Sequence, residues 1–325
     1  MNVGERSRFF STSVTQLSFF VAESVHHDPI AQLPEYLKLA LPTNPFTLSS
    51  SALGLLLVFR TNSSYSRWWE ARGCWGKIIN HTRNIMRMGS SWTLKGATDL
   101  NEAQRLENVK NLATATWEFP RALCRHLLSS EEDELDFQNA MRERLSPEQA
   151  EAIIAVRHRP TKALFDLSTA VDALGLPFVK RIEIDKSVVV LTDMAGACER
   201  IFSSPVPLVY TRHTARFLSL WLLLLPFALY SPFKDTWNHV GMIPTAAAVS
   251  FFFFGIEELA VQLEEPFSIL PMHAMTNGIN LSCQEYRQWH TDSQDEYKAL
   301  AQPQIPAAIP QWNAPPTTNP NSYMP

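Results

Sequence analysis

Residues 45–80 read PFTLSSSALGLLLVFRTNSSYSRWWEARGCWGKIIN. Pro45 suits the first turn of a helix. We expect no interruption before Gly89, which predicts a helix of about 45 residues, or roughly 65 Å at 1.5 Å per residue. The first half of this helix is apolar and the second half is charged. Such a helix leaves a bilayer and continues into an aqueous domain, with Trp68 and Trp69 near the boundary, where indole rings prefer to lie.

Among the stretches of the chain that lack Lys, Arg, Asp and Glu, four matter as candidate spans, at residues 9–22, 39–59, 217–233 and 236–256. A membrane-spanning helix needs about 20 mostly apolar residues, so the last two stretches predict a transmembrane hairpin. The serines of the second stretch favour a helix that packs among other helices or faces water over one that faces lipid. The first stretch is short and hydroxylated, and fits a span only marginally. We therefore predict four membrane spans, at about residues 9–25, 40–62, 215–233 and 236–258.

The basic residues between these spans lie mostly on one side of the membrane. If all four spans cross, both termini and residues 63–214 share the side that holds most of the Arg and Lys, and the other side has Lys38 and Lys234. This asymmetry follows the positive-inside rule. Residues 63–214 are too many for a connector, so we expect them to fold outside the membrane. Residues 301–325 are rich in Pro, Asn and Thr, which predicts a disordered tail.

The extramembrane segment has the apolar spacing of helices. One apolar face is expected within residues 101–128, made of Leu106, Val109, Leu112, Ala113 and Trp117. Ser146 and Pro147 mark the start of another helix, as N-cap and first helical residue. Pro177 ends one helical pattern before the next begins. No alternating strand pattern occurs between turns, so the fold class is all-α.

Charge and cysteine content argue against several classes of protein. A net charge of −4 and a pI of 6.1 argue against nucleic-acid binding, which needs a basic excess. The four cysteines have no Cys-x-x-Cys spacing and indicate reduced thiols rather than a zinc site or a disulfide framework. His26, His27, Asp28 and His158 lack partners at ligand spacing. We predict no enzyme activity, no catalytic residue and no cofactor.

Residues 45–80 resemble the bestrophin family, including its bacterial and chloroplast branches. The string Arg-Thr-Asn…Tyr-Ser-Arg-Trp-Trp-Glu-Ala-Arg is specific for that family. Two further pieces agree in order and spacing, PVPLVYTRHTARFLSLWLLLLPFAL at 205–229 and FFFFGIEELAVQLEEPFSILP at 251–271. The resemblance covers roughly residues 40–290.

The resemblance implies an all-α homopentamer in which residues 1–300 of each subunit surround one central anion pore. Its partners would be other copies of the chain, membrane lipid and permeant anions. Chloride is the expected ion and bicarbonate the alternative, because the photosynthetic branch is associated with the flux of these anions across the thylakoid. We accordingly expect a multi-pass protein of the chloroplast thylakoid membrane, with the plasma or another internal membrane as the alternative.

The resemblance also implies a narrow pore neck lined by Ser51, Leu55 and Phe59. Their spacing of four residues places all three on one helix face, although packing against a neighbouring helix would use the same spacing. Relatives have an apolar residue at the outermost position, so Ser51 should make that ring wetter. A second constriction is expected at Val179 or Phe178, at the start of the helix after Pro177.

Animal members of the family bind calcium in an acidic clasp after the last span. This chain retains Glu264 and Glu265 there but lacks the run of Asp residues. Because calcium prefers six to eight oxygen ligands, these glutamates are weak metal candidates, and we expect no calcium dependence of the animal type.

Two other functions use the same spans. A proton-coupled anion carrier would need acidic residues or Lys inside the membrane, and the four uncharged stretches contain none. A membrane scaffold would use the Pro-rich tail to recruit partners.

Overall fold

The computed structural model describes residues 40–94, 100–128, 130–234 and 239–301. Every regular element within these residues is a helix, which confirms the all-α fold class for the described part of the chain. The helices are α2 (Asn44–Thr93), α3 (Glu102–Leu127), α4 (Glu131–Arg144), α5 (Pro147–Ala155), α6 (Arg159–Ala173), α7 (Phe178–Ser203), α8 (Leu208–Leu229), α9 (Met242–Glu264), α10 (Pro266–Ile269) and α11 (Met272–Ala301).

Helix α2 runs unbroken for 50 residues, or about 75 Å at 1.5 Å per residue. Pro45 lies in its first turn, as the sequence predicted. The helix continues past Gly89 to Thr93, where the Thr93 hydroxyl donates a hydrogen bond to the Gly89 carbonyl at 2.8 Å. The predicted long helix is therefore confirmed and is one turn longer than expected.

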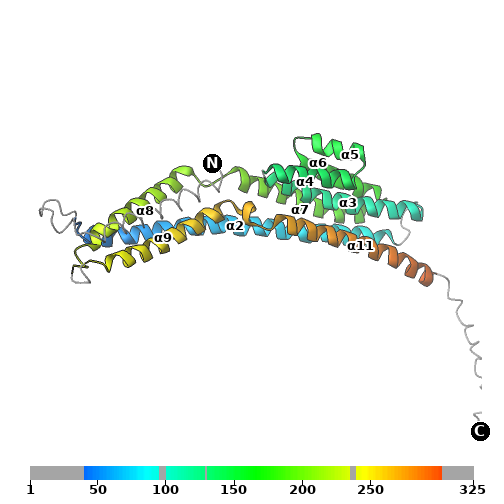
Figure 1. Ribbon diagram of the computed structural model, residues 1–325. Coiled ribbons are helices and arrows are strands. Elements are labelled where there is room, and N and C mark those ends of the chain that lie inside the picture. The colour runs from blue at the N-terminus through cyan, green and yellow to red at the C-terminus, as the bar shows by residue number, and fades with distance from the viewer. Residues whose placement is uncertain (1–39, 95–99, 129, 235–238, 302–325) are drawn as a thin grey trace, which may run out of the picture.

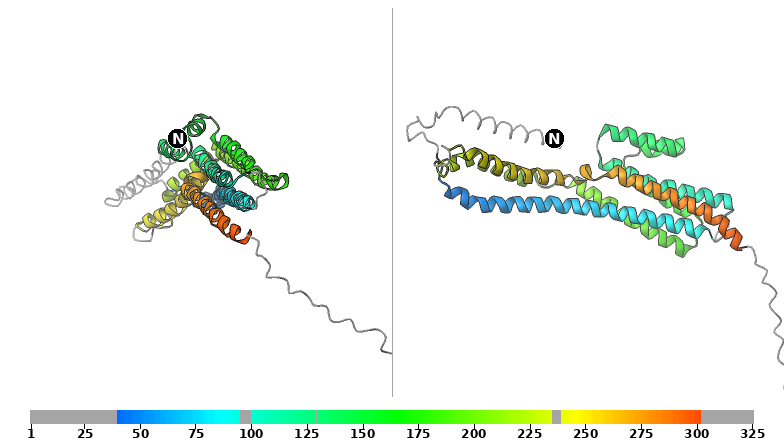
Figure 2. Two further views of the ribbon diagram at one scale, coloured as in Figure 1. Left: turned by 90° about the vertical axis from the view of Figure 1, so that its right-hand side faces the viewer. Right: turned by 60° about the horizontal axis from the view of Figure 1, so that its bottom comes forward.

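The molecule is elongated around α2 (Figure 1). Helices α8 and α9 lie along the first half of α2, and α3, α7 and α11 lie along its second half. The right-hand view of Figure 2 shows α2, in blue to cyan, passing through both groups. We call α8, α9 and residues 44–66 of α2 the narrow end, and α3–α7, α11 and residues 67–93 of α2 the broad end.

Each end has its own apolar core. The core of the narrow end is small, and its buried residues are Leu53, Leu57, Leu218, Leu222 and Leu225. The broad end has a much larger core, with Trp75, Phe119 and Phe137 among its largest fully buried side chains. The broad end thus has enough buried apolar surface to form a conventional aqueous domain.

Local sequence signals explain most helix starts in the broad end. The Ser146 hydroxyl accepts a hydrogen bond from the Gln149 backbone N–H, and the Gln149 side chain bonds back to Ser146, which completes a capping box. Pro177 directly precedes α7. Of the predicted apolar face of α3, Leu106 remains exposed, whereas its other members are buried. The prediction for Leu106 was wrong. Helical periodicity predicts which side of α3 is buried, but not how far the neighbouring helices extend along that side.

One helix among the described residues, α9, is long and apolar enough to cross a membrane by length and composition. It begins at Met242, six residues after the start of the predicted span at 236, because residues 239–241 form a turn. The predicted spans at 40–62 and 215–233 overlap the first half of α2 and most of α8. The predicted span at 9–25 and nearly all of the 301–325 tail lie outside the described residues.

Candidate functional site

Ser51, Leu55 and Phe59 lie together on one exposed face of α2. Leu55 is 55% exposed and Phe59 is 57% exposed, whereas Leu53 and Leu57 on another face are buried against α8 and α9. The three predicted neck residues therefore do not form the core of a single subunit. Their face is left for contact with solvent, lipid or another subunit.

The same face continues into the broad end. Successive residues of an α-helix advance by about 100°, and this places further exposed residues in line with the three above. These residues are Asn62, Ser66, Trp69, Gly73, Lys77 and Asn80. The complete face, from Ser51 to Asn80, is called the α2 stripe. It is apolar at Leu55 and Phe59 and mostly polar beyond them, with one exposed indole at Trp69 and one positive charge at Lys77. Counting the helical spacing beyond Phe59 would have found this face in the sequence.

Phe178 and Val179 lie in the part of the broad end that is farthest from the predicted neck. Both are strongly exposed, at 75% and 72%, in the first turn of α7. Their neighbour Lys180 lies 5.8 Å above the ring of Trp92, in the last turn of α2. Most of the second half of α2 therefore lies between this pair and Phe59. The side chains of Phe178, Val179 and Phe59 are all exposed.

Arg67 joins the two ends of the molecule. Its guanidinium donates hydrogen bonds to the carbonyls of Ile201 and Ser204 at 2.7 Å each, and to the carbonyl of Glu264 at 3.2 Å. These carbonyls lie at the C-terminal ends of α7 and α9, where no helical partner remains. Arg67 thereby stabilises both helix ends against α2, a role that its presence in the family string did not reveal.

A buried ion pair between Arg60 of α2 and Glu257 of α9 lies inside the narrow end. Arg60 is 3% exposed and Glu257 is 1% exposed. Within the described residues, Arg60 Nε and Glu257 Oε2 have no hydrogen-bond partner. The pair is therefore strongly desolvated, and each member depends on the other for compensation.

The Arg60–Glu257 pair corrects the expectation that the spans hold no acidic residue. Glu257 and its neighbour Glu258 lie within α9 and within the predicted span at 236–258. The uncharged stretches at 39–59 and 236–256 each end one residue before a member of the pair. This coincidence was the only signal in the sequence, and it does not identify the partner of either residue.

The two weak metal candidates differ in environment. Glu264 is buried at the end of α9, whereas Glu265 is exposed at the junction with α10. The described part of the chain holds no group of three or more His, Cys, Asp or Glu side chains that could bind a metal ion. His158 lies 6.3 Å, between ring centroids, from His126, and His26, His27 and Asp28 lie outside the described residues.

Comparison with known proteins identifies the relatives of this chain. The family model described as "Bacterial/Fungal Bestrophin protein" matches residues 9–285. Voltage-dependent chloride channel 2, chloroplastic, of Arabidopsis thaliana is 33% identical over 228 residues, which are 70% of this chain and 52% of that protein. A voltage-dependent anion channel-forming protein of Nostoc sp. is 31% identical over 238 residues, which are 71% of this chain and 73% of that protein.

Solved structures agree with these sequence matches. A crystal structure of a bacterial bestrophin homolog from Klebsiella pneumoniae is 25% identical, with a TM-score of 0.70, and the match covers 85% of this chain and 96% of that one. This chain spans about half the length of the two chloroplast relatives from Arabidopsis.

Proposed function

This chain belongs to the bestrophin family, and we propose that it conducts anions passively through a pore lined by the α2 stripe. Membership of this family makes it a membrane protein. The observation that carries the proposal is the exposure of Leu55 and Phe59 on one face of α2, in line with Lys77. An apolar face that continues into a polar one with a positive charge at Lys77 suits a pore neck that opens into a wider, hydrated vestibule.

The exposed stripe of one subunit needs other subunits to enclose a pore. We propose a homopentamer in a four-span topology, as the family resemblance implies. The mass of the purified protein in detergent should correspond to five chains, and a monomer or dimer would contradict the proposal. Protease cleavage within residues 130–150 should occur only from the side that also carries the C-terminus.

The neck would select anions by dehydration. The edges of five phenyl rings at Phe59 carry partial positive charge and solvate an anion weakly, so anions that lose water easily should pass best. Ser51 adds a hydroxyl at the outer level. Chloride is the proposed physiological ion and bicarbonate the alternative. Calcium is not proposed as a requirement, and currents should persist when calcium is chelated.

Replacement of Phe59 tests the neck directly. Phe59→Ala should raise the conductance and weaken the preference for iodide and nitrate over chloride, because the wider ring no longer forces dehydration. Planar-bilayer currents under ion gradients measure both effects. Phe251→Ala is the control, because it removes another exposed phenyl ring, from α9 and off the α2 stripe. Unchanged permeability ratios in an assembled Phe59→Ala channel would remove this residue from the pore. Leu55→Ala should act in the same direction with a smaller effect.

A proton-coupled anion carrier is the second candidate. The observation in its favour is that an acidic residue, Glu257, is buried in the narrow end. Its ion pair with Arg60 gives Glu257 a structural role instead. Unitary currents in single-channel recordings would support the channel, since a stoichiometric carrier does not produce them.

The compartment is proposed from the relatives. The chloroplast names of two Arabidopsis relatives favour the thylakoid membrane, and the plasma or another internal membrane is the alternative. A fluorescent tag at the C-terminus should colocalise with thylakoid markers. Fluorescence confined to any other membrane would contradict this assignment.

A further inference from the structure

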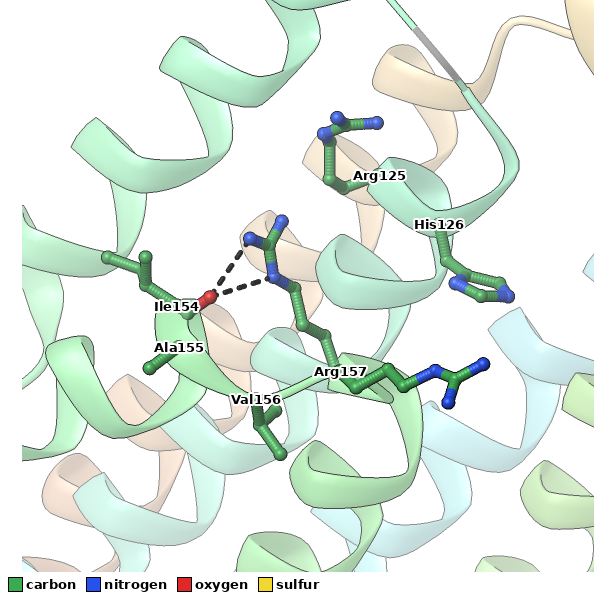
Figure 3. A pocket seen from close by; sticks show the side chains of 7 residues that line it. Arg125, His126, Ile154, Ala155, Val156 and Arg157 are labelled. Carbon is green, nitrogen blue, oxygen red and sulfur yellow. Dashed lines mark hydrogen bonds between the residues drawn. The ribbon is translucent and has the colours of Figure 1, made fainter.

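A hollow of about 350 Å³ lies in the broad end, between the C-terminal part of α3 and the turn that joins α5 to α6 (Figure 3). We call it the arginine hollow, and it is lined by Arg125, His126, Ile154, Ala155, Val156, Arg157 and Arg159. Three arginines and one histidine are therefore among the residues that line one small space. The proposed conduction pathway does not use any of these residues.

Two of the three arginines are held in place by one carboxylate. Glu134 Oε2 accepts hydrogen bonds from Arg159 Nη1 at 2.7 Å and from Arg125 Nε at 2.5 Å. The Arg159 guanidinium is the main cause that lowers the pKa of Glu134 to about 2. The carbonyl of Ile154 accepts two further hydrogen bonds from Arg159, at 2.9 and 3.3 Å, drawn as dashed lines in Figure 3. The basic wall of the hollow is thus rigid before any ligand arrives.

The remaining basic groups are less compensated. Arg157 is exposed, and its side chain forms no ion pair or hydrogen bond with the residues that the structure describes. Figure 3 shows its guanidinium on the same side of the hollow as the His126 imidazole. His126 Nε2 lies 3.6 Å from a carboxylate oxygen of Glu199. Two carboxylates therefore face three arginines and one histidine, which leaves a net positive charge.

We propose that the arginine hollow binds a phosphate group, either free inorganic phosphate or the phosphate of a small organic monoester. Arginine is suited to phosphate because its planar guanidinium donates two parallel hydrogen bonds to adjacent oxygens. Arg157 supplies the free donors and the positions of Arg125 and Arg159 are fixed by Glu134. The apolar side chains of Ala155 and Val156 line the same space and offer a surface to the organic part of a monoester.

Thermal unfolding of the full chain in detergent tests the proposal. A ligand that binds the folded state alone raises the melting temperature with its concentration. Inorganic phosphate and glycerol phosphate are titrated in separate arms at constant chloride and ionic strength, and sodium nitrate serves as the anion control. Both phosphates should stabilise the wild type, and nitrate should not. Tighter binding of glycerol phosphate identifies the monoester as the ligand, whereas equal or weaker binding identifies free phosphate.

Variants show where the phosphate binds. Arg157→Gln should weaken phosphate binding by about tenfold or more, because it removes a charge-assisted, bidentate donor. Arg157→Lys should retain part of the affinity, since it keeps the charge but not the paired geometry. Arg142→Gln is the control on α4: it removes an arginine outside the hollow, one that pairs with Glu151, and it should bind phosphate as the wild type does. The proposal is overturned if phosphate does not stabilise the wild type at millimolar concentration, or if a folded Arg157→Gln variant binds phosphate with unchanged affinity.

Discussion

The broad end fully buries several large aromatic side chains, whereas the narrow end leaves those described in it partly or strongly exposed. In the broad end Trp75 and Phe119 are completely buried, whereas in the narrow end Phe251 is 82% exposed and Phe252 is also open. In water such exposure would be costly. In a membrane, however, lipid tails are as apolar as the side chains, so helices need not bury them within one subunit. Burial in a single chain therefore identifies the core of the broad end, and in the proposed channel the open aromatic side chains of the narrow end would face lipid or other subunits.

The largest loss of stability is expected from breaking the Arg60–Glu257 pair, because the narrow end buries these two charges although it leaves aromatic side chains exposed. Arg60→Met leaves Glu257 buried without its partner and should destabilise the protein by about 3–5 kcal/mol. The double variant Arg60→Met/Glu257→Met replaces the pair with apolar side chains and should recover most of this loss. Size-exclusion chromatography and thermal unfolding in detergent measure both. A single variant as stable as the double would show that the pair contributes nothing.

Leucines in the two ends should respond differently to truncation. Leu112→Ala in the broad end removes a fully buried side chain and should cost about 2–5 kcal/mol. Leu220→Ala, which truncates an exposed leucine of α8, should cost the single subunit less than about 1 kcal/mol. Chemical unfolding of the detergent-solubilised protein gives both values. A large loss at Leu220 would mean that subunit contacts cover this face.

The broad end should also have its own pH dependence, centred on Glu118 of α3. Burial, followed by the nearby charge of Asp166, raises the pKa of Glu118 from an ordinary value of 4.5 to about 8. The folded state therefore holds a proton that the unfolded chain has lost between these values, and stability falls as pH rises through this window. The linkage amounts to about 2 kcal/mol between about pH 6 and pH 8.

Melting temperatures across this pH range test the role of Glu118, with Glu118→Gln as the variant. The amide imitates the protonated acid, so the variant should lose the decline in stability above neutral pH. Glu102→Gln, near the start of the same helix, is a control that should retain it. If the Glu118→Gln curve runs parallel to the wild type, another group causes the pH dependence.

A small net effect is expected at Gly89, where α2 approaches α3 closely. A Cβ at this position would lie 2.3 Å from Leu112 Cδ2. Gly89→Ala should therefore destabilise the protein by about 1–3 kcal/mol through overpacking. The higher helix propensity of alanine offsets about 1 kcal/mol of this cost. In the double variant Gly89→Ala/Leu112→Ala the added methyl group fills part of the cavity. The two costs should then be less than additive in a double-mutant cycle, and strict additivity would contradict the close approach.

Local signals predicted much of the fold, and contacts between distant residues were not predictable. Pro45, Ser146 and Pro177 act within one or two helical turns, so their helix starts could be predicted from the sequence alone. The Arg60–Glu257 pair joins residues 197 positions apart, and no pattern along a single helix encodes such a partner.

The candidate pore face was partly predictable for the same reason. Helical spacing places Ser51, Leu55 and Phe59 on one side of α2, and the structure shows that α8 and α9 leave this side open. Whether the side faces a pore depends on other subunits, about which the spacing of one helix contains no information. The three residues and the pair Phe178 and Val179 therefore remain predictions.

The continuity of α2 has a mechanical consequence. After Pro45 the helix contains no proline, which is the commonest cause of a sharp kink, so Phe59 and Gly89 belong to one stiff rod and lie about 45 Å apart along it. A rotation of about 2° at the Gly89 end moves the Phe59 ring sideways by about 1.5 Å at that length. In the proposed channel the helix would thus act as a lever, and a small rearrangement near Gly89 in each subunit would be magnified into a change of pore diameter at Phe59.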